Sequence, residues 1–306
     1  MAFPRTDSIW MNGRQVPWDK ATVHVLSHVI HYGSCLFEGI RCYKLPDGSG
    51  VFRLRDHVER LFDGCAIYRM KVPYTRSEIE TAILETIRAN HMEACYIRPF
   101  VYRGYESLGV DPTPCPIDAA VAVWSWGDYL GKEAVEKGVD VMVSTWRRMA
   151  PDTLPMLAKA GANYMNSQLI KVEALANGYA EGIALDTDGM ISEGSGENIF
   201  LVRKGTIYTP PLTSAILEGI TRRSILQLAS DLSLPVVEER LPREMLYIAE
   251  EVFFAGTAVE IIPVRSVDRV PVGRGVRGEM TSLLQAEFSA ITSGRKPDRH
   301  HWLTRV

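Results

Sequence analysis

Apolar residues recur along the chain at two spacings, and together these predict a mixture of helices and strands. A recurrence every three or four residues is typical of a helix with one buried face. It is found in residues 54–70, 76–91, 163–176, 220–232 and 279–292. Short apolar runs, typical of buried strands, occupy residues 94–101, 118–126, 139–146, 182–186, 190–192, 198–202, 207–209, 252–254 and 261–267.

The order of these elements predicts the fold class and a division into domains. The turn Thr187-Asp188-Gly189 joins two strands as a hairpin. Hairpins among helices favour an α/β fold with antiparallel or mixed (α+β) sheets over a doubly wound nucleotide-binding fold. A glycine-containing and charged stretch follows residue 126. We therefore expect an N-terminal domain at 1–128, a linker at 129–137 and a C-terminal domain at 138–306, as 306 residues suggest for about two domains.

Composition and charge exclude several classes of protein. The chain is 46% hydrophobic and 23% charged, the average for a soluble globular protein, which excludes disordered, collagen-like and disulfide-rich chains. A net charge of −3 argues against a general nucleic-acid binder. We see no signal peptide and no apolar stretch that could span a bilayer. Five scattered cysteines are typical of reduced thiols in the cytoplasm, where we expect this protein to act on small molecules.

Two motifs suggest sites that we do not expect to exist. Residues 273–278 spell G-x-G-x-x-G, but too little chain follows for a second strand and its acidic residue, so we expect a turn. His24, His28 and His31 are spaced as on one helix face, but no acidic residue lies between them at ligand spacing. We expect structural histidines and no metal site.

One lysine differs from the others in its surroundings. Lys159 lies in Met-Leu-Ala-Lys-Ala-Gly-Ala, with no acidic residue within six positions. Poor solvation favours the neutral amine that Schiff-base chemistry needs. The alternative is a lysine that extends from a loop into solvent.

Three further features would suit an anionic cofactor. Gly219 precedes a predicted helix whose first N–H groups could hold a phosphate. The turn after the strand at 252–254, which contains Thr257, could do the same, and Glu193 ends a strand at a glycine-rich turn. An amine, a phosphate cradle and a fixed carboxylate fit a pyridoxal-phosphate site, although spacing does not show that they converge.

Several ordered segments make the sequence resemble a known family. They are HYGSCLFEGIR at 31–41, YIRP at 96–99, LGVDP at 108–112, AKAGANY at 158–164, ISEGSGENIF at 191–200, GITR at 219–222 and GTAVEI at 256–261. From residue 9 to residue 303 the chain resembles the bacterial branched-chain amino acid aminotransferases, which are fold-type IV pyridoxal 5'-phosphate enzymes. The resemblance implies a small N-terminal domain and a larger C-terminal, cofactor-binding domain.

The resemblance also implies roles for individual residues toward the cofactor. Lys159 would bond to the cofactor and move the substrate proton, and Glu193 would pair with the pyridine nitrogen. Tyr164 would donate to the ring 3-oxygen and Leu217 would pack on the ring face. The phosphate would be held by Arg60, Ile220, Thr221 and Thr257.

For the substrate, the resemblance implies an apolar pocket with an arginine at its edge. Thr257 and Ala258, with Tyr96, would hold the substrate carboxylate. Arg98 is our candidate for the second carboxylate of 2-oxoglutarate, with Arg41 and Tyr32 as helpers. The pocket walls would be Phe37, Trp126, Tyr129 and Tyr164, joined from a partner subunit by Tyr32, Leu108 and Val110. We therefore expect at least a homodimer, with a trimer of dimers as a further option.

The expected reaction is transamination of L-leucine, L-isoleucine and L-valine with 2-oxoglutarate, which gives the 2-oxoacid and L-glutamate. The alternatives on the same fold are a D-amino acid or (R)-amine transaminase and an aminodeoxychorismate lyase. A non-catalytic binding protein is a third class. The segments around Phe37 and Arg98 favour the branched-chain reaction, and the presence of both Lys159 and Glu193 argues against a dead site.

Overall fold

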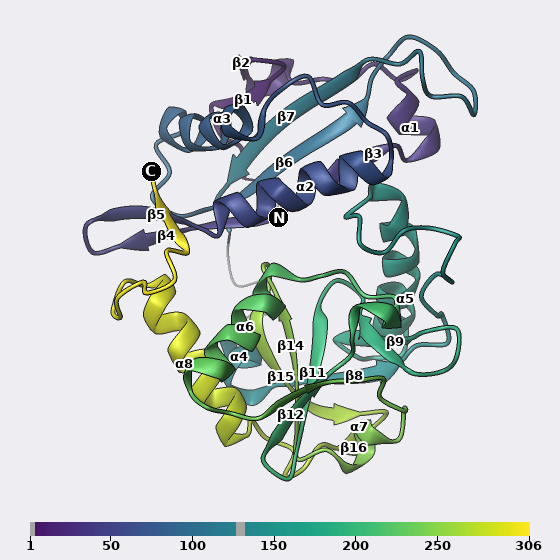
Figure 1. Cartoon of the computed structure of the whole chain (residues 1–306), viewed down its shortest axis with the longest axis vertical. Coiled ribbons are helices and arrows are strands. Elements are labelled where there is room, and N and C mark those ends of the chain that lie inside the picture. The colour runs from purple at the N-terminus through teal and green to yellow at the C-terminus, as the bar shows by residue number, and fades with distance from the viewer. Residues whose placement is uncertain (1–3, 127–131) are drawn as a thin grey trace. The chain divides into compact units, whose positions relative to one another are not determined.

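The computed structural model describes residues 4–126 and 132–306, which fall into two compact units (Figure 1). The first unit contains the chain up to Trp126 together with Ala158–Ala162 and Ile291–Val306. The second contains the described residues from 132 to Leu157 and Asn163–Ala290. The domain bounds at 1–128 and 138–306 stay a prediction. The two compact units differ from these bounds, because Ala158–Ala162 and Ile291–Val306 pack with the first unit. Within the predicted linker, residues 129–131 lie outside the described residues.

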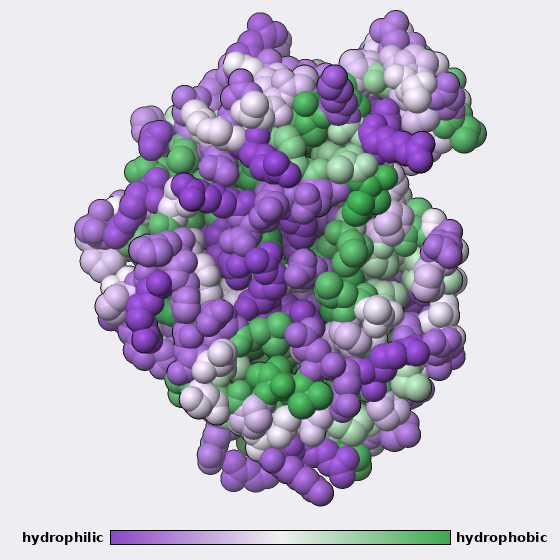
Figure 2. Space-filling model, viewed as in Figure 1, coloured by the Kyte–Doolittle hydropathy of each residue, from purple (hydrophilic) through white to green (hydrophobic). Residues whose placement is uncertain are grey.

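The surface agrees with the composition. Figure 2 shows a face that is mainly hydrophilic, with hydrophobic patches of limited size between the polar residues. Among the described residues, none of the helices is both long enough and apolar enough to cross a membrane.

In the described residues, the first unit contains an eight-stranded sheet in the order β17-β5-β4-β6-β7-β1-β2, with β3 also paired to β6. Every pairing in this sheet is antiparallel. The strands are β1 (Ser8–Met11), β2 (Arg14–Pro17), β3 (Cys35–Phe37), β4 (Ile40–Leu45), β5 (Gly48–Phe52), β6 (Cys95–Arg103), β7 (Ile117–Trp124) and β17 (Leu303–Arg305). The helices are α1 (His28–Tyr32), α2 (Leu54–Ile67) and α3 (Arg76–Ala89).

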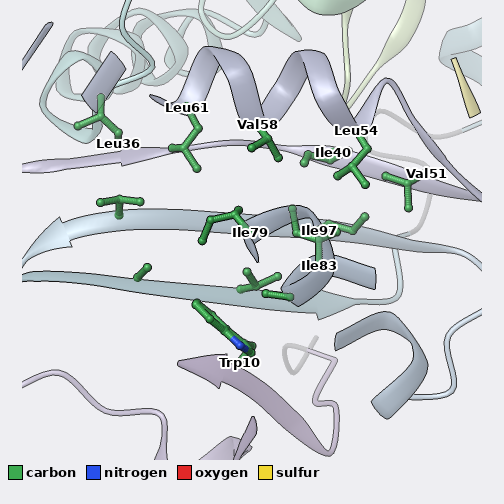
Figure 3. Close-up of a cluster of buried hydrophobic side chains, with 14 of the residues drawn as sticks. Trp10, Leu36, Ile40, Val51, Leu54, Val58, Leu61, Ile79, Ile83 and Ile97 are labelled. Carbon is green, nitrogen blue, oxygen red and sulfur yellow. The ribbon is translucent and has the colours of Figure 1, made fainter. Parts of the chain in front are cut away.

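The core of the first unit lies between this sheet and two amphipathic helices. Leu54, Val58 and Leu61 point from α2 toward the sheet, where Ile40 and Ile97 are fully buried (Figure 3). The α3 helix begins with a capping box in which Thr75 and Glu78 satisfy each other's backbone N–H groups. The apolar spacing that predicted both helices is therefore the spacing of their buried faces.

The second unit contains a nine-stranded sheet in the order β10-β9-β8-β15-β14-β11-β12-β13, with β16 paired to β15, among the residues described. The β8–β9, β8–β15 and β12–β13 pairs are parallel and the others antiparallel. The strands are β8 (Val139–Val143), β9 (Glu181–Leu185), β10 (Ile191–Gly194), β11 (Asn198–Arg203), β12 (Thr206–Thr209), β13 (Val236–Glu238), β14 (Glu251–Gly256), β15 (Glu260–Val267) and β16 (Val270–Pro271). The helices are α4 (Lys132–Lys137), α5 (Tyr164–Ala176), α6 (Ile220–Asp231), α7 (Met245–Ile248) and α8 (Glu279–Thr292). Short 3-10 turns occupy Trp18–Lys20, Gly161–Asn163 and Leu212–Ser214.

The prediction of an α/β fold with antiparallel and mixed sheets is confirmed. Each predicted helix and strand is present, with ends that differ by at most a few residues. The sequence patterns missed β1 to β5, β13, β16 and β17, because these strands are short or half exposed and lack a continuous apolar run. They also missed the short helices α1 and α7, and α4, since the predicted linker is helical from Lys132.

Candidate active site

Lys159 lies on a five-residue segment, Ala158–Ala162, that packs in the first unit. Its carbonyl accepts a hydrogen bond from the Phe37 backbone N–H at 3.1 Å, and Ala160 forms a bridge with Leu36 of β3. The neighbouring alanines, Ala158 and Ala160, are buried, whereas Lys159 is only half buried. The small side chains thus let the segment lie against β3, and the backbone contacts with Leu36 and Phe37 fix the position of the lysine backbone.

The Lys159 amine lies near a group of aromatic rings around Arg98. Its Nζ lies 5.1 Å from the centroid of the Phe37 ring. The Arg98 guanidinium carbon lies 4.7 Å from the same centroid and 5.6 Å from the Tyr96 ring. Tyr96 stacks on Trp126, with centroids 4.3 Å apart. The first unit therefore brings Lys159, Phe37, Tyr96, Arg98 and Trp126 together.

One ring of this group was missed by the sequence analysis. Trp124 lies 5.7 Å from the Arg98 guanidinium and 5.1 Å from Tyr96. Its position two residues before Trp126, at the end of β7, was the signal that could have found it. Tyr129, the other predicted wall residue, lies outside the described residues. Arg41, the predicted helper of Arg98, has its guanidinium 5.1 Å from the Tyr43 ring.

Glu38 holds Arg60 by two hydrogen bonds. The fully buried Glu38 carboxylate accepts from Arg60 Nε at 2.7 Å and from Arg60 Nη2 at 2.8 Å. His57 Nδ1 lies 2.7 Å from the same carboxylate. Burial raises the pKa of Glu38, but Arg60 and His57 outweigh that effect and hold the pKa well below its usual range. Burial lowers the pKa of His57, which therefore donates to Glu38 as a neutral ring near pH 7.

In the second unit, Glu193 is buried beside an arginine that no sequence motif contained. Arg148 Nη2 lies 3.3 Å from the Glu193 carboxylate, and both side chains are almost fully buried. Arg148 also donates to the Gly194 carbonyl at 2.5 Å and the Ser195 carbonyl at 3.0 Å. Glu193 accepts from the Leu217 N–H at 3.2 Å. A buried carboxylate needs such partners, because an uncompensated charge is strongly disfavoured there.

The α6 helix begins three residues after Leu217, the backbone donor to Glu193. Its N-cap is Gly219, which has no side chain to cap the first turn, and the first turn contains no acidic residue. Ile220 and Thr221 follow as buried residues. Such an N-terminus favours an anion through its N–H groups and the helix dipole.

Three other predicted residues of this unit are half buried. Tyr164 is the first residue of α5, while Thr257 and Ala258 lie in the turn between β14 and β15. The structure therefore places this turn directly after a strand, as the sequence predicts.

Tyr32, Leu108 and Val110 are exposed on the first unit, and Val110 is 91% exposed. His28 connects them, since its ring lies 4.4 Å from the Tyr32 ring and its Nε2 3.0 Å from the Gly109 carbonyl oxygen. The two segments therefore lie side by side.

The glycine-rich and histidine motifs that we discounted make ordinary structural contacts. The N-terminus of α8, after the G-x-G-x-x-G segment, is occupied by Glu251, which accepts from the N–H groups of Met280 at 3.0 Å and Thr281 at 2.8 Å. His28 also contacts Ser34 Oγ, while the Nε2 of His31 lies 3.0 Å from the Val25 carbonyl. The described residues contain no group of three or more potential metal ligands.

A third buried carboxyl, Glu197, gives a prediction about pH. Burial, Glu181 and, to a smaller extent, Glu193 raise the pKa of Glu197 to about 8, opposed by Lys171 and the Gly196 N–H. Because the folded protein binds this proton more tightly than the unfolded chain does, stability should fall as pH rises from about 5 to 8. We expect Glu197→Gln to raise the Tm, with a gain that grows from pH 6 to pH 9 in thermal melts.

The control for this prediction is Glu239→Gln, which neutralises an exposed carboxyl of the same unit. It should change the Tm by nearly the same small amount at every pH. A Tm gain for Glu197→Gln that does not depend on pH would show that Glu197 is ionised throughout.

With the geometry described, comparison with known proteins defines the class. Residues 35–267 match the amino-transferase class IV family, and the chain belongs to this family. It is 48% identical over 307 residues to the branched-chain-amino-acid aminotransferase of Salmonella typhimurium, which covers 100% of this chain and 99% of that protein. The corresponding Escherichia coli K12 protein is equally similar, at 48% identity over the same length.

Solved structures agree with this assignment. The crystal structure of the Escherichia coli branched-chain amino acid aminotransferase matches with a TM-score of 0.97 at 48% identity, and covers 98% of this chain and 99% of that one. The T.th. enzyme of the same name, solved with pyridoxamine 5'-phosphate, matches with a TM-score of 0.95 at 44% identity and covers 99% of both chains. The fold is that of class IV aminotransferases. Full-length similarity to branched-chain enzymes does not favour the D-amino acid, (R)-amine or lyase alternatives.

Proposed function

We propose that this protein transfers the amino group of L-leucine, L-isoleucine or L-valine to 2-oxoglutarate, with pyridoxal 5'-phosphate as cofactor. The observation that carries the proposal is the grouping of Lys159 with Arg98 inside a set of aromatic rings. The Lys159 amine suits the transfer chemistry, and the aromatic rings suit the branched aliphatic side chain of one substrate. The Arg98 guanidinium suits the second carboxylate of the other substrate, 2-oxoglutarate. The similar T.th. enzyme was also solved with 4-methylvaleric acid and with N-(5'-phosphopyridoxyl)-L-glutamate.

The residues of the second unit fit such a cofactor. The buried Glu193 carboxylate, balanced by Arg148, suits a protonated ring nitrogen. The glycine-capped start of α6 suits a phosphate. When bound, pyridoxal phosphate supplies an electron sink for the charge that develops at the substrate α-carbon.

The chain's own residues would then bind, orient and move a proton. Lys159 would bond to the cofactor and carry the proton to and from the substrate α-carbon. Arg60, Ile220, Thr221 and Thr257 would hold the phosphate. Tyr164 would donate to the ring 3-oxygen and Leu217 would cover the ring face. Tyr96, Thr257 and Ala258 would hold the substrate carboxylate.

The visible spectrum of the purified protein tests the reaction. We expect a yellow protein whose absorbance band bleaches with L-leucine and returns with 2-oxoglutarate. D-alanine is the control and should leave the band unchanged. A band that responds to D-alanine and not to L-leucine would overturn the proposal.

Arg98 should separate the two halves of the reaction. Its guanidinium lies over Phe37, and its Nε has no hydrogen-bond partner within the described part of the chain. A charge-assisted hydrogen bond contributes about 1.5–3 kcal/mol. We therefore expect Arg98→Ala to lower kcat/KM for 2-oxoglutarate by about 10–100-fold in single-half-reaction kinetics, and for L-leucine by less than about threefold.

The matched control is Arg269→Ala, which removes an exposed arginine that also lies over a tyrosine ring, 5.1 Å from the centroid of Tyr179. It should alter neither half-reaction. Equal losses for leucine and 2-oxoglutarate in Arg98→Ala would contradict the dual-substrate role.

We also propose that the protein is at least a homodimer, with a trimer of dimers as the larger option, and that it acts in the cytoplasm. The support is a set of exposed apolar residues in the first unit, whose segments around Tyr32 and Gly109 meet through His28. The residues are Val25, Ile30, Tyr32, Tyr105, Leu108 and Val110. Exposed apolar groups of this kind commonly mark interfaces. The five cysteines, all free thiols, suit a reducing compartment.

Replacing Val110 by aspartate tests the dimer. A charge within an apolar interface is costly to desolvate, so light scattering after size exclusion should show a shift from dimer to monomer. Val237→Asp, at an exposed valine of the second unit, is the control and should keep the wild-type mass. A monomeric wild type would contradict the proposal.

A further inference from the structure

Asn198 forms a closed set of hydrogen bonds with Glu193 and Leu217. Its side-chain Nδ2 donates to Glu193 Oε2 at 3.2 Å and to the Leu217 carbonyl at 2.9 Å. The Leu217 N–H donates to the same Glu193 oxygen at 3.2 Å. The Glu193 carboxylate and the residues before α6 are therefore held together by one amide group.

The other side of the Asn198 amide lies against the N-cap of α6. A Cβ added to Gly219 would lie 1.9 Å from Asn198 Oδ1, so only glycine permits this approach. Gly219 is the residue from which α6 begins. Asn198 thus contacts the carboxylate at one end and the helix start at the other.

Burial makes this arrangement rigid. Glu193 and Asn198 are each 5% exposed, and Arg148 also balances the Glu193 charge. A buried amide that is bonded or packed on both sides has one allowed position, because any rotation would leave buried polar groups unsatisfied. A shift of Glu193 would therefore be transmitted to the α6 N-terminus.

We propose that Asn198 is a positioning residue that sets the distance between the Glu193 carboxylate and the first turn of α6. This inference rests on the proposed function, in which Glu193 faces the ring nitrogen and α6 faces the phosphate of one small molecule. The ring nitrogen and the phosphate of the cofactor must be bound at the same time. A fixed distance between Glu193 and the start of α6 therefore lets binding at one end strengthen binding at the other. Asn198 itself touches neither end of the cofactor in this proposal.

The test measures coupling between the two ends of the ligand by calorimetry on the cofactor-free protein. The probes are pyridoxamine 5'-phosphate and pyridoxamine, which form no covalent bond with Lys159. The Kd of pyridoxamine divided by the Kd of pyridoxamine 5'-phosphate reports how much the phosphate strengthens binding. In the wild-type background, Glu193→Gln should lower this ratio by about fivefold or more. In the Asn198→Ala background, Glu193→Gln should leave it unchanged within about twofold.

Two further variants complete the design. Asn198→Leu keeps the approximate size of the side chain but has no donor, so it should also abolish the coupling. It replaces Asn198→Ala in the test if that variant does not fold. Asn177→Ala is the matched control, since Asn177 also donates to a backbone carbonyl, at 2.8 Å, but at the end of α5. It should keep the wild-type coupling.

The outcomes separate this inference from the proposed function. Coupling that persists in Asn198→Ala and Asn198→Leu overturns the positioning role while pyridoxamine 5'-phosphate still binds. Coupling lost in these variants and kept in Asn177→Ala supports it. A wild-type protein that binds neither probe overturns the proposed function itself.

Discussion

Replacing Lys159 by alanine is expected to leave a folded protein that binds pyridoxamine 5'-phosphate but does not transaminate. Lys159 is half buried, and its fold-defining contact is made by its backbone carbonyl, so loss of the side chain should leave the fold intact. Loss of a general acid–base group alone costs about 10²–10⁴-fold, and loss of the covalent bond to the cofactor adds to this. We expect single-turnover rates with L-leucine to fall at least about 10⁴-fold, while circular dichroism stays unchanged.

The control for Lys159→Ala is Lys44→Ala. Lys44 forms an exposed ion pair with Glu93 at 2.6 Å in the same unit, and such pairs contribute little. Its loss should leave turnover within about twofold of the wild type. A Lys159→Ala protein that retained more than about a tenth of the wild-type rate would show that another group performs the chemistry.

The second large effect is expected on stability, from Arg148→Met. This change removes the guanidinium that lies 3.3 Å from the Glu193 carboxylate and that donates to the carbonyls of Gly194 and Ser195. Removing one partner of a buried ion pair costs about 3–5 kcal/mol, because the remaining charge is uncompensated. Urea unfolding should show a loss of this size in the free energy of unfolding.

A double variant identifies the cause. If the buried charge dominates, Arg148→Met with Glu193→Gln should be more stable than Arg148→Met alone, since the double variant buries no carboxylate at this position. Lys137→Met, which breaks an ion pair with Glu133 that is exposed on both sides, is the control and should cost less than about 1 kcal/mol. If the double variant were no more stable than Arg148→Met, the lost carbonyl hydrogen bonds would account for the effect.

The fold could be predicted where one physical signal was repeated along a segment. The helices α2, α3 and α6 each bury one continuous face, and their apolar spacing marked them closely. The strand β2 has no buried residue and β1 only one, Trp10, so neither produced an apolar run. The two strands pair with each other across the turn Asn12-Gly13, a hairpin signal that the apolar pattern does not contain. The place of this hairpin in the sheet depends on the pairing of β1 with β7, which is far away in the sequence.

The residues of the candidate site also fall into those that a local sequence pattern identifies and those that it does not. Lys159 could be found because its own neighbours are small and apolar. Arg148 could not, because its partner Glu193 is distant in the sequence and the arginine belongs to no local pattern. Arg60 and Asp56 lie on the same helix, one turn apart, yet Asp56 binds Arg53 and Arg60 binds Glu38. A local pattern identifies which residues carry charge, whereas the fold decides which charges meet.

The division of the first unit into three segments affects the order in which the chain can fold as it is synthesised. The strand β17 completes the sheet by pairing with β5, so that sheet lacks one strand until residues 303–305 have left the ribosome. The second unit needs no residue beyond Ala290. Although domains usually fold N-terminal first during synthesis, here the later unit can reach its final contacts before the earlier one. The segment with Lys159 would therefore pack against the sheet of the first unit before β17 has been synthesised and paired with β5.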